Sequence, residues 1–319
     1  MGNRLEGRVV IVTGAGRGIG AEVARWMADD GASVVVNDLG GAVDGAGTSN
    51  APAEQVAQGI RDKGGTAVAN FDSVAEYESA GRIVQAAIDN FGRLDAVCNV
   101  AGILRDRMVF NMTETEWDSV LSVHLNGAFN MVRHATPHMI RQKYGRIVLF
   151  SSGSGLGASG QVNYAAAKEG MVGFARSLAK ELGPYGITVN AVYPGGATRM
   201  TESVPQSTRD LRGQQQAAQT AQQPAAMQSQ GPPIQGPAEA SDPANNAPKA
   251  VYLCTEAAGD ITGQVIGISG WQMTLYSPRH VTSSIHKSGR WTLDELDQLI
   301  PISLAAGLTN PVPAAPPRE

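Results

Sequence analysis

The sequence contains few cysteines, no excess of positive charge and no long apolar run. Only Cys98 and Cys254 occur among its 319 residues, and both lie in apolar segments, so we expect a protein of a reducing compartment without a disulfide framework. A net charge of −4 provides no basic field that would attract a nucleic acid. No apolar run approaches the length that crosses a membrane. We therefore expect neither nucleic acid nor membrane as a partner.

Targeting signals are also lacking. The chain runs directly into its first apolar strand without a signal peptide, and Glu6 stands where a myristoylation signal would need serine or threonine. It ends in Pro317, Arg318 and Glu319, where a peroxisomal protein would carry Ser-Lys-Leu. These observations predict a cytoplasmic location.

Short Val- and Ile-rich runs alternate with helical patterns over the first two-thirds of the chain. Each run is apolar throughout, as expected for strands of a parallel sheet that helices cover on both faces. The helical segments 117–132 and 171–182 each have one apolar face, which would pack either on the sheet or on another subunit. The pattern predicts an α/β protein with a doubly wound Rossmann fold and a seven-stranded parallel sheet. The predicted strands are 9–13, 33–37, 66–70, 96–99, 146–150, 187–191 and 264–268.

Two regions depart from this alternation. Residues 204–243 are rich in Gln, Ala and Pro, which predicts either a disordered insert or a mobile lid over a substrate. Residues 271–319 contain one predicted helix, 292–299, which Thr292 and Glu295 would cap. We therefore predict one Rossmann domain, 1–270, that carries the insert, followed by a C-terminal extension, 271–319.

A glycine-rich string follows the first predicted strand and opens a helix. In such a turn, backbone N–H groups can approach a pyrophosphate at the helix N-terminus. Asp38 ends the second strand, where a carboxylate accepts hydrogen bonds from a ribose diol and repels the 2′-phosphate of NADP. Arg17 could pair with that phosphate and would favour NADP, but Leu39 stands where a second cation would help. The sequence therefore predicts NAD. The predicted cofactor contacts in the string are Gly14, Gly16, Arg17, Gly18, Ile19 and Gly20.

Further motifs follow in order along the chain. They are Asn99-Val100-Ala101-Gly102, Asn126, Ser151-Ser152, Tyr164-Ala165-Ala166-Ala167-Lys168, Pro194-Gly195 and Thr198. With the glycine string, they make the chain resemble the short-chain dehydrogenase/reductases over residues 5–204 and 247–270. The resemblance implies an enzyme that interconverts a secondary alcohol and a ketone, as a homodimer or homotetramer. One departure is Ser269-Gly270-Trp271 in place of the common Asp-Gly-Gly, at a point that would affect the sheet edge or subunit contacts.

Tyr164 and Lys168 are the predicted acid–base pair. A phenol has a pKa of about 10 and is a poor base near neutral pH. On a helix the two side chains are neighbours one turn apart. The ammonium, together with the positive charge of oxidised nicotinamide, is therefore expected to stabilise the phenolate and lower its pKa.

The resemblance implies that Tyr164 takes the hydroxyl proton while hydride leaves for the nicotinamide, and that Lys168 also holds the nicotinamide ribose. It further implies that Ser152 binds the substrate oxygen and that Asn126 anchors a water linking Lys168 to solvent. Counting back from Tyr164 points instead to Ser151, but alternation from the strand end favours Ser152. No metal is expected. Further implied cofactor contacts are Asp72 and Ser73 at the adenine, Asn99, Ala101, Gly102, Pro194 and Gly195, and Thr198 at the carboxamide.

Three longer strings, 36–41, 68–74 and 101–107, resemble the (3R)-hydroxyacyl-CoA dehydrogenase part of multifunctional β-oxidation enzymes, also described as a 17β-hydroxysteroid dehydrogenase. This implies a 3-hydroxyacyl-CoA substrate, including bulky or steroid-like acyl chains. Arg105 and Arg107 would either steer the CoA phosphates or be ordinary surface arginines. One alternative is an NADPH-dependent 3-ketoacyl reductase, against which Asp38 argues, or a hydroxysteroid dehydrogenase. A non-enzyme alternative is a nucleotide-binding scaffold subunit that docks through the insert.

Overall fold

The computed structural model describes residues 2–202 and 239–308. The chain divides into two compact units, one made of Met1–Thr208 and Pro232–Tyr276 and the other of Arg209–Gly231 and Ser277–Glu319. Of the predicted insert, residues 204–238 lie outside the described residues. The first unit contains the sheet and every residue predicted for the site.

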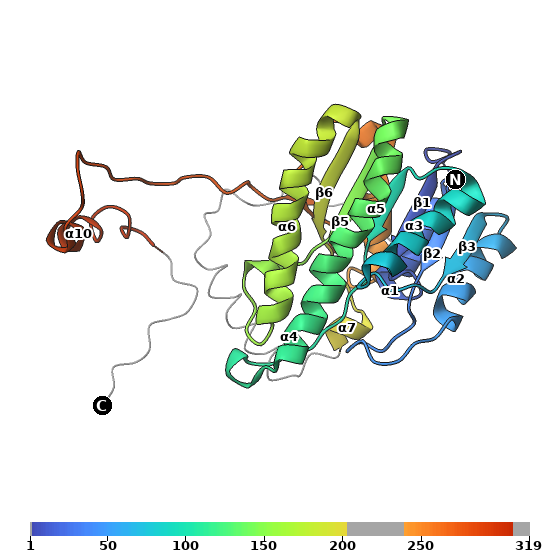
Figure 1. Cartoon of the computed structure of the whole chain (residues 1–319), viewed down its shortest axis with the longest axis horizontal. Coiled ribbons are helices and arrows are strands. Elements are labelled where there is room, and N and C mark those ends of the chain that lie inside the picture. Colours follow the sequence, from blue (N-terminus) through green and yellow to red (C-terminus); the bar gives the residue numbers. More distant parts are fainter. Residues whose placement is uncertain (1, 203–238, 309–319) are drawn as a thin grey trace. The chain divides into compact units, whose positions relative to one another are not determined.

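One mixed sheet forms the centre of the first unit (Figure 1). Its strand order is β3-β2-β1-β4-β5-β6-β7-β8, and the first seven of these strands pair in parallel. The order reverses between β1 and β4, and in open α/β sheets ligands bind outside the carboxyl ends of strands at such a switch point. The strands are β1 Val9–Thr13, β2 Ser33–Asn37, β3 Thr66–Asn70, β4 Ala96–Asn99, β5 Gly145–Phe150, β6 Ile187–Tyr193, β7 Val265–Gly267 and β8 Thr274–Leu275.

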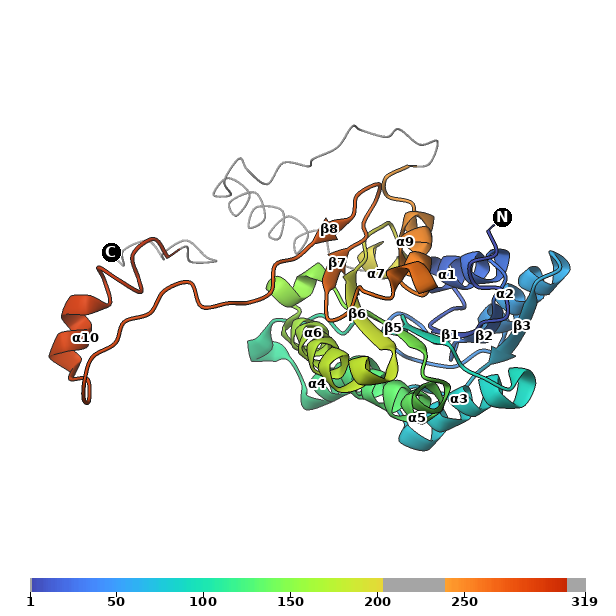
Figure 2. The same ribbon diagram turned by 90° about the horizontal axis from the view of Figure 1, so that it is seen from above.

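Helices cover both faces of the sheet. Alternate strand residues point to opposite faces, so Val10 and Val12 belong to one core with residues of α1, α2 and α9, whereas Val9 and Ile11 belong to a second core with residues of α3, α5 and α6. Figure 2 shows α1 and α9 on one side and α3, α5 and α6 on the other. The apolar faces of α5 and α6 therefore pack on the sheet. The helices are α1 Gly18–Asp29, α2 Ala51–Asp62, α3 Tyr77–Phe91, α4 Glu114–Leu121, α5 Gly127–Gln142, α6 Val162–Leu182, α7 Arg199–Glu202 and α9 Ala247–Tyr252.

The prediction of seven strands missed β8, which pairs antiparallel with β7. The two residues of β8 are exposed, so β8 has no apolar run by which the sequence could reveal it. A turn with Gly270 at φ +50° leads from β7 toward β8. The ammonium of Lys249 fixes this turn by donating to the carbonyl oxygens of Ile268 at 3.1 Å and Gln272 at 3.0 Å. The departure at 269–271 thus lies where the sheet gains its edge strand.

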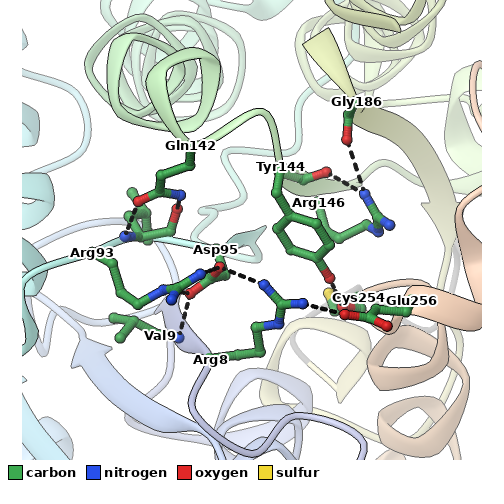
Figure 3. A network of polar contacts seen from close by, with 12 residues as sticks. Arg8, Val9, Arg93, Asp95, Gln142, Tyr144, Arg146, Gly186, Cys254 and Glu256 are labelled. Atoms are coloured by element: carbon green, nitrogen blue, oxygen red, sulfur yellow. Dashed lines mark hydrogen bonds and ion pairs between the residues drawn. The ribbon is translucent and has the colours of Figure 1, made fainter.

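A charged network ties the amino ends of the central strands together (Figure 3). Asp95 precedes β4, is 1% exposed, and accepts hydrogen bonds from the Val9 backbone N–H at 2.9 Å and from Arg8 at 3.1 Å. Arg93 donates to both oxygens of the same carboxylate, each at 2.7 Å. The Arg8 guanidinium also lies 3.9 Å from the centre of the Tyr144 ring. Because these groups lie at the amino ends of the strands, the network is a structural clamp away from the predicted site.

The described part of the second unit, residues 277–308, contains one helix, α10 Leu293–Leu299. Thr292 and Glu295 form the predicted capping box, and Lys287 pairs with Glu295 at 2.6 Å. Over the described ranges of both units, the helices are too short or too polar to span a bilayer. The same ranges contain no group of three His, Cys, Asp or Glu side chains that could hold a metal ion.

Candidate active site

The turn between β1 and α1 is built for close approach. Gly14 and Gly18 have φ angles of +64° and +52°, and residues other than glycine rarely adopt such positive values. A Cβ on Gly14 would lie 2.7 Å from the Cα of Ala101, and one on Gly20 would lie 2.2 Å from the carbonyl oxygen of Gly14. Arg17 is the N-cap of α1, but no side chain caps the helix. Helix N-H groups therefore face outward without a capping side chain, which suits the phosphates of a dinucleotide.

Asp38 is held at the end of β2, facing the glycine turn. Its carboxylate accepts hydrogen bonds from the backbone N–H of Gly16 at 2.8 Å and of Gly40 at 2.6 Å. The exposed Arg17 side chain donates to the carbonyl oxygen of Gly41 at 3.4 Å. Asp72 follows β3, and its carboxylate accepts from Arg82 Nε at 2.7 Å. A carboxylate retains further lone pairs after such bonds, so Asp38 can still receive a ribose hydroxyl.

Thr13 and Asn246 are supporting residues that the sequence analysis missed. The hydroxyl of Thr13 donates to Asn99 Oδ1 at 3.1 Å and accepts from the backbone N–H of Ala101 at 3.2 Å. The fully buried Asn246 accepts from the Gly195 N–H at 3.1 Å and donates to the Gly195 carbonyl oxygen at 2.7 Å. The sequence indicated these two residues only as a polar residue at the end of an apolar strand and as an Asn at the start of a short helix. Both residues fix loops at the carboxyl edge of the sheet.

A cavity of about 640 Å³ opens at this edge. Most of the predicted site residues line it: Gly14, Arg17, Gly18, Ile19, Gly20, Asp38, Asp72, Ser73, Ala101, Gly102, Tyr164, Lys168, Pro194 and Thr198. Three predicted residues do not line the cavity but take part in the hydrogen bonds that fix its loops: Gly16, Asn99 and Gly195. Ser151 lines the cavity and Ser152 does not. The cavity size and its mostly apolar lining suit a nucleotide cofactor with a substrate beside it.

The two candidate serines do different things. The Ser151 hydroxyl is buried and donates to the Lys168 carbonyl oxygen at 2.6 Å. The Ser152 hydroxyl accepts from the Ser154 N–H at 3.1 Å and interacts with the Tyr164 hydroxyl, where it lowers the tyrosine pKa. This geometry favours Ser152 over Ser151 as the serine that acts with Tyr164.

Tyr164 and Lys168 lie one turn apart on α6 and both line the cavity. The Lys168 ammonium donates to the Phe150 carbonyl oxygen and lies 5.4 Å from the centre of the Tyr164 ring. Burial raises the pKa of Tyr164 to about 12, and burial lowers the pKa of Lys168 to about 7. In the protein alone the tyrosine is therefore a proton donor. The lowered phenol pKa expected from the sequence concerns the site with oxidised nicotinamide bound and stays a prediction.

Asn126 does not join this group. It ends a π-helical turn, Ser122–Asn126, between α4 and α5, and its side chain is exposed. The wider π-turn changes which residues face inward, so His124 lines the cavity instead and is 1% exposed. Its ring meets the Tyr164 ring edge to face, with centres 5.0 Å apart. The sequence analysis assigned His124 no role, and the unusual turn left no periodic signal.

Comparison with known proteins identifies the class. A family model described as short chain dehydrogenase matches residues 8–209, and the chain belongs to this family. A crystal structure of a short chain dehydrogenase from Mycobacterium avium is similar with a TM-score of 0.77 and 38% identity, covering 94% of this chain and 96% of that one. The predicted α/β Rossmann class and the predicted family are thereby confirmed.

Three curated relatives narrow the resemblance. Peroxisomal multifunctional enzyme type 2 of Mus musculus is 48% identical over 63% of this chain, a match that spans only 27% of the mouse protein. Hydroxyacyl-CoA dehydrogenase ChsB1 of Mycobacterium tuberculosis is 34% identical, with 92% of this chain and 87% of that one covered. The 3-oxoacyl-acyl-carrier-protein reductase FabG of Staphylococcus aureus is 37% identical, with 82% and 96% covered. The first two names bear out the predicted resemblance, and the third belongs to a reductase.

Proposed function

We propose that this protein is an NAD-dependent dehydrogenase that oxidises a 3-hydroxyacyl-CoA to the 3-ketoacyl-CoA. The observation that carries the proposal is the convergence of Tyr164, Lys168 and the glycine turn on one cavity at the switch point of the sheet. The names of two relatives, a multifunctional enzyme of peroxisomes and a hydroxyacyl-CoA dehydrogenase, support the substrate class.

Tyr164 is the proposed acid–base group. In oxidation, the phenolate takes the proton of the substrate hydroxyl while hydride leaves the same carbon; in reduction, the phenol returns the proton to the ketone oxygen. In the protein alone the Ser152 hydroxyl interacts with the Tyr164 hydroxyl; because it has a single O–H donor, it is proposed to turn to the substrate oxygen when substrate binds. Bound oxidised nicotinamide supplies the hydride acceptor and a positive charge. Because the pKa of Tyr164 is about 12 without that charge, we infer that the base forms only when the oxidised cofactor is present.

NAD is the proposed cofactor because of Asp38. Two backbone N–H groups fix its carboxylate beside the glycine turn, so a 2′-phosphate there would meet a fixed negative charge. Arg17 is the residue that could favour NADP by pairing with the 2′-phosphate, but its exposed guanidinium donates to the carbonyl oxygen of Gly41. Asp72 and Ser73 line the same cavity and are the proposed neighbours of the adenine.

The CoA part is assigned to one of the two arginines. Arg105 lines the cavity, donates through Nε to the Asp44 carbonyl oxygen at 2.9 Å, and has no ion-pair partner among residues 2–202 and 239–308. Arg107 instead pairs at 2.8 Å with Glu116, which also closes the capping box of α4. We therefore propose that Arg105 attracts the CoA phosphates and that Arg107 is structural.

A spectrophotometric assay tests the proposal. The protein is offered NAD or NADP with 3-hydroxyacyl-CoA esters of increasing acyl length, with free steroid alcohols as comparison substrates. We expect NADH to form from the CoA esters. Turnover of steroid alcohols alone would reject the substrate class, and a strong preference for NADPH in the reverse reaction would favour the reductase alternative that the FabG relative represents.

The assembly and the location stay predictions. A homodimer or homotetramer is tested by light scattering of the purified protein. A cytoplasmic location is tested by fractionation of the source cells.

A further inference from the structure

Tyr164 lies in the first turn of α6, the part of a helix that is held least firmly. It is the third residue of the helix, and the N-cap residue Gln161 makes no side-chain capping bond. The first N–H groups of a helix have no partner within the helix, and helix ends fray. Catalysis needs a fixed group, because a displacement of about 1 Å can cost roughly a hundredfold in rate. Other contacts must therefore hold this turn.

Asn163, the residue before Tyr164, supplies these contacts. It is fully buried, and its Oδ1 accepts a hydrogen bond from the Tyr164 backbone N–H at 2.7 Å. Its Nδ2 donates to the carbonyl oxygens of Arg105 and Glu116, each at 3.0 Å. An amide has one acceptor oxygen and two N–H donors, so all three bonds form at once and fix its orientation. One side chain thus caps Tyr164 and ties it to the segment after β4 and to α4.

The segment bonded to Asn163 is the one that carries Arg105. It runs beside the residues that lead into α6, because the Arg107 N–H donates to the Gly160 carbonyl oxygen at 2.8 Å. The Arg105 side chain lines the cavity and is the proposed contact of the CoA phosphates. Asn163 therefore fixes the backbone of that proposed contact and the backbone of Tyr164 to one another.

Lys168 is held by contacts of its own. Its ammonium donates to the Phe150 carbonyl oxygen, and its backbone carbonyl oxygen accepts from the Ser151 hydroxyl at 2.6 Å. Phe150 ends β5 and Ser151 follows it directly, so Lys168 is anchored to the sheet and not to the start of α6. Loss of the Asn163 amide should therefore loosen Tyr164 and leave Lys168 in place.

We propose that Asn163 is a positioning residue of the reaction, which holds the Tyr164 hydroxyl at the substrate oxygen by anchoring the first turn of α6 to the segment of Arg105. The proposal rests on the proposed acid–base role of Tyr164. Asn163 does not line the cavity, so it acts through the tyrosine and transfers no proton itself. Its loss should slow the chemical step and leave the binding of substrate and cofactor largely as it was.

Asn163→Ala is compared with the wild type and with Asn190→Ala as a matched control. Asn190 is also buried and also bonds two backbone groups, since it donates to the Ile261 carbonyl oxygen at 2.7 Å and accepts from the Gln264 N–H at 3.1 Å. It lies on β6 and does not line the cavity. Thermal unfolding first gives a temperature at which all three proteins are folded, and NADH fluorescence shows that each binds cofactor.

Two quantities are then measured at that temperature. Hydrogen exchange of the Tyr164 amide, followed by mass spectrometry, should be about tenfold faster in Asn163→Ala, because the N–H has lost its acceptor and the turn its anchor. The turnover number should fall about tenfold to a hundredfold, while the Michaelis constants for NAD and substrate stay within about threefold of the wild-type values. Asn190→Ala should match the wild type in both measurements.

Three results would overturn the proposal. One is wild-type turnover in Asn163→Ala despite faster exchange, since the anchor would then not matter for the chemistry. Another is unchanged exchange at Tyr164, since the amide would then not hold the turn. The third is an equal loss of turnover in Asn163→Ala and Asn190→Ala, since that pattern reports a general loss of stability.

The choice of substrates separates this proposal from the proposed function. All proteins, with Tyr164→Phe added, are tested on 3-hydroxybutyryl-CoA and on a small secondary alcohol without CoA. If the wild type oxidises only the alcohol, the CoA assignment fails, and the comparison of Asn163→Ala with Asn190→Ala on the alcohol decides the positioning role. If Tyr164→Phe keeps wild-type turnover, the acid–base role fails and the positioning role fails with it. If Tyr164→Phe is inactive and Asn163→Ala matches the wild type, the positioning role fails alone.

Discussion

Lys168 carries a positive charge into a buried site, and its replacement should stabilise the fold while removing activity. The residue is 3% exposed, and burial lowers its pKa from 10.5 to about 7. Each pKa unit corresponds to about 1.4 kcal/mol, so burying the charged form of Lys168 costs the folded protein roughly 5 kcal/mol at most. Lys168→Met retains much of the length without the charge, but it leaves the Phe150 carbonyl oxygen unpaired at a cost of about 1–3 kcal/mol. A net gain of about 1–3 kcal/mol in the free energy of unfolding at neutral pH follows.

The pH dependence gives a sharper test with a definite sign. The folded pKa lies below the unfolded value, so the unfolded chain binds more protons between the two, and the stability contributed at Lys168 rises with pH over that window. From about pH 7 to about pH 9 the wild type should gain roughly 2 kcal/mol more than Lys168→Met does. Urea unfolding of both proteins at several pH values measures the difference. Lys180→Met, at an exposed position of the same helix α6, is the matched control and should follow the wild type.

The reasoning fails if Lys168→Met is no more stable than the wild type and shows the same pH slope. That result would mean that the ammonium is well solvated. The tyrosine does not confuse the measurement, because burial raises the pKa of Tyr164 to about 12. Its effect on stability therefore develops only above about pH 10, and with the opposite sign.

Three further predictions address the cofactor turn, the cofactor choice and the structural clamp. Gly14→Ala should abolish NADH binding, as read by fluorescence, because its Cβ would lie 2.7 Å from Ala101; normal binding would show that the turn can relax. Asp38→Ala should relax discrimination between NAD and NADP in steady-state kinetics, and unchanged discrimination would assign the ribose to another group. Asp95→Ala removes the buried carboxylate that accepts from Arg8, Arg93 and the Val9 N–H and should lower the free energy of unfolding by about 1–3 kcal/mol. Its Michaelis constants should stay unchanged, and a change in them would contradict the separation of the clamp from the site.

The parallel strands could be predicted because each is an apolar run between helices, as in the Val9–Thr13 strand. The short edge strand β8 could not, because its pairing depends on a glycine turn and on Lys249 rather than on its own two residues. The spacing of Tyr164 and Lys168 likewise gave their proximity. The rise in the pKa of Tyr164 in the protein alone was not predictable. Burial causes it, and the spacing of residues along a helix does not reveal burial.

The serine and the histidine show where local pattern stops being informative. Ser151 and Ser152 are adjacent, and only the three-dimensional contacts separate the hydroxyl that binds the Lys168 backbone from the one that meets Tyr164. His124 and Asn126 lie two residues apart on a segment that reads as an ordinary helix. The π-turn, in which His124 is buried and Asn126 is exposed, has no signature in apolar periodicity.

The central claim is that Tyr164 moves the proton while hydride passes between substrate and cofactor, and an isotope measurement tests it most directly. Wild-type protein and Tyr164→Phe are each incubated with NAD and 3-hydroxybutyryl-CoA that carries deuterium at C3, and the deuterium in the NADH formed is measured by mass spectrometry. The account predicts that the wild type transfers the label and that Tyr164→Phe does so at least about a hundredfold more slowly while still binding NADH. Transfer at the wild-type rate in Tyr164→Phe would contradict the account.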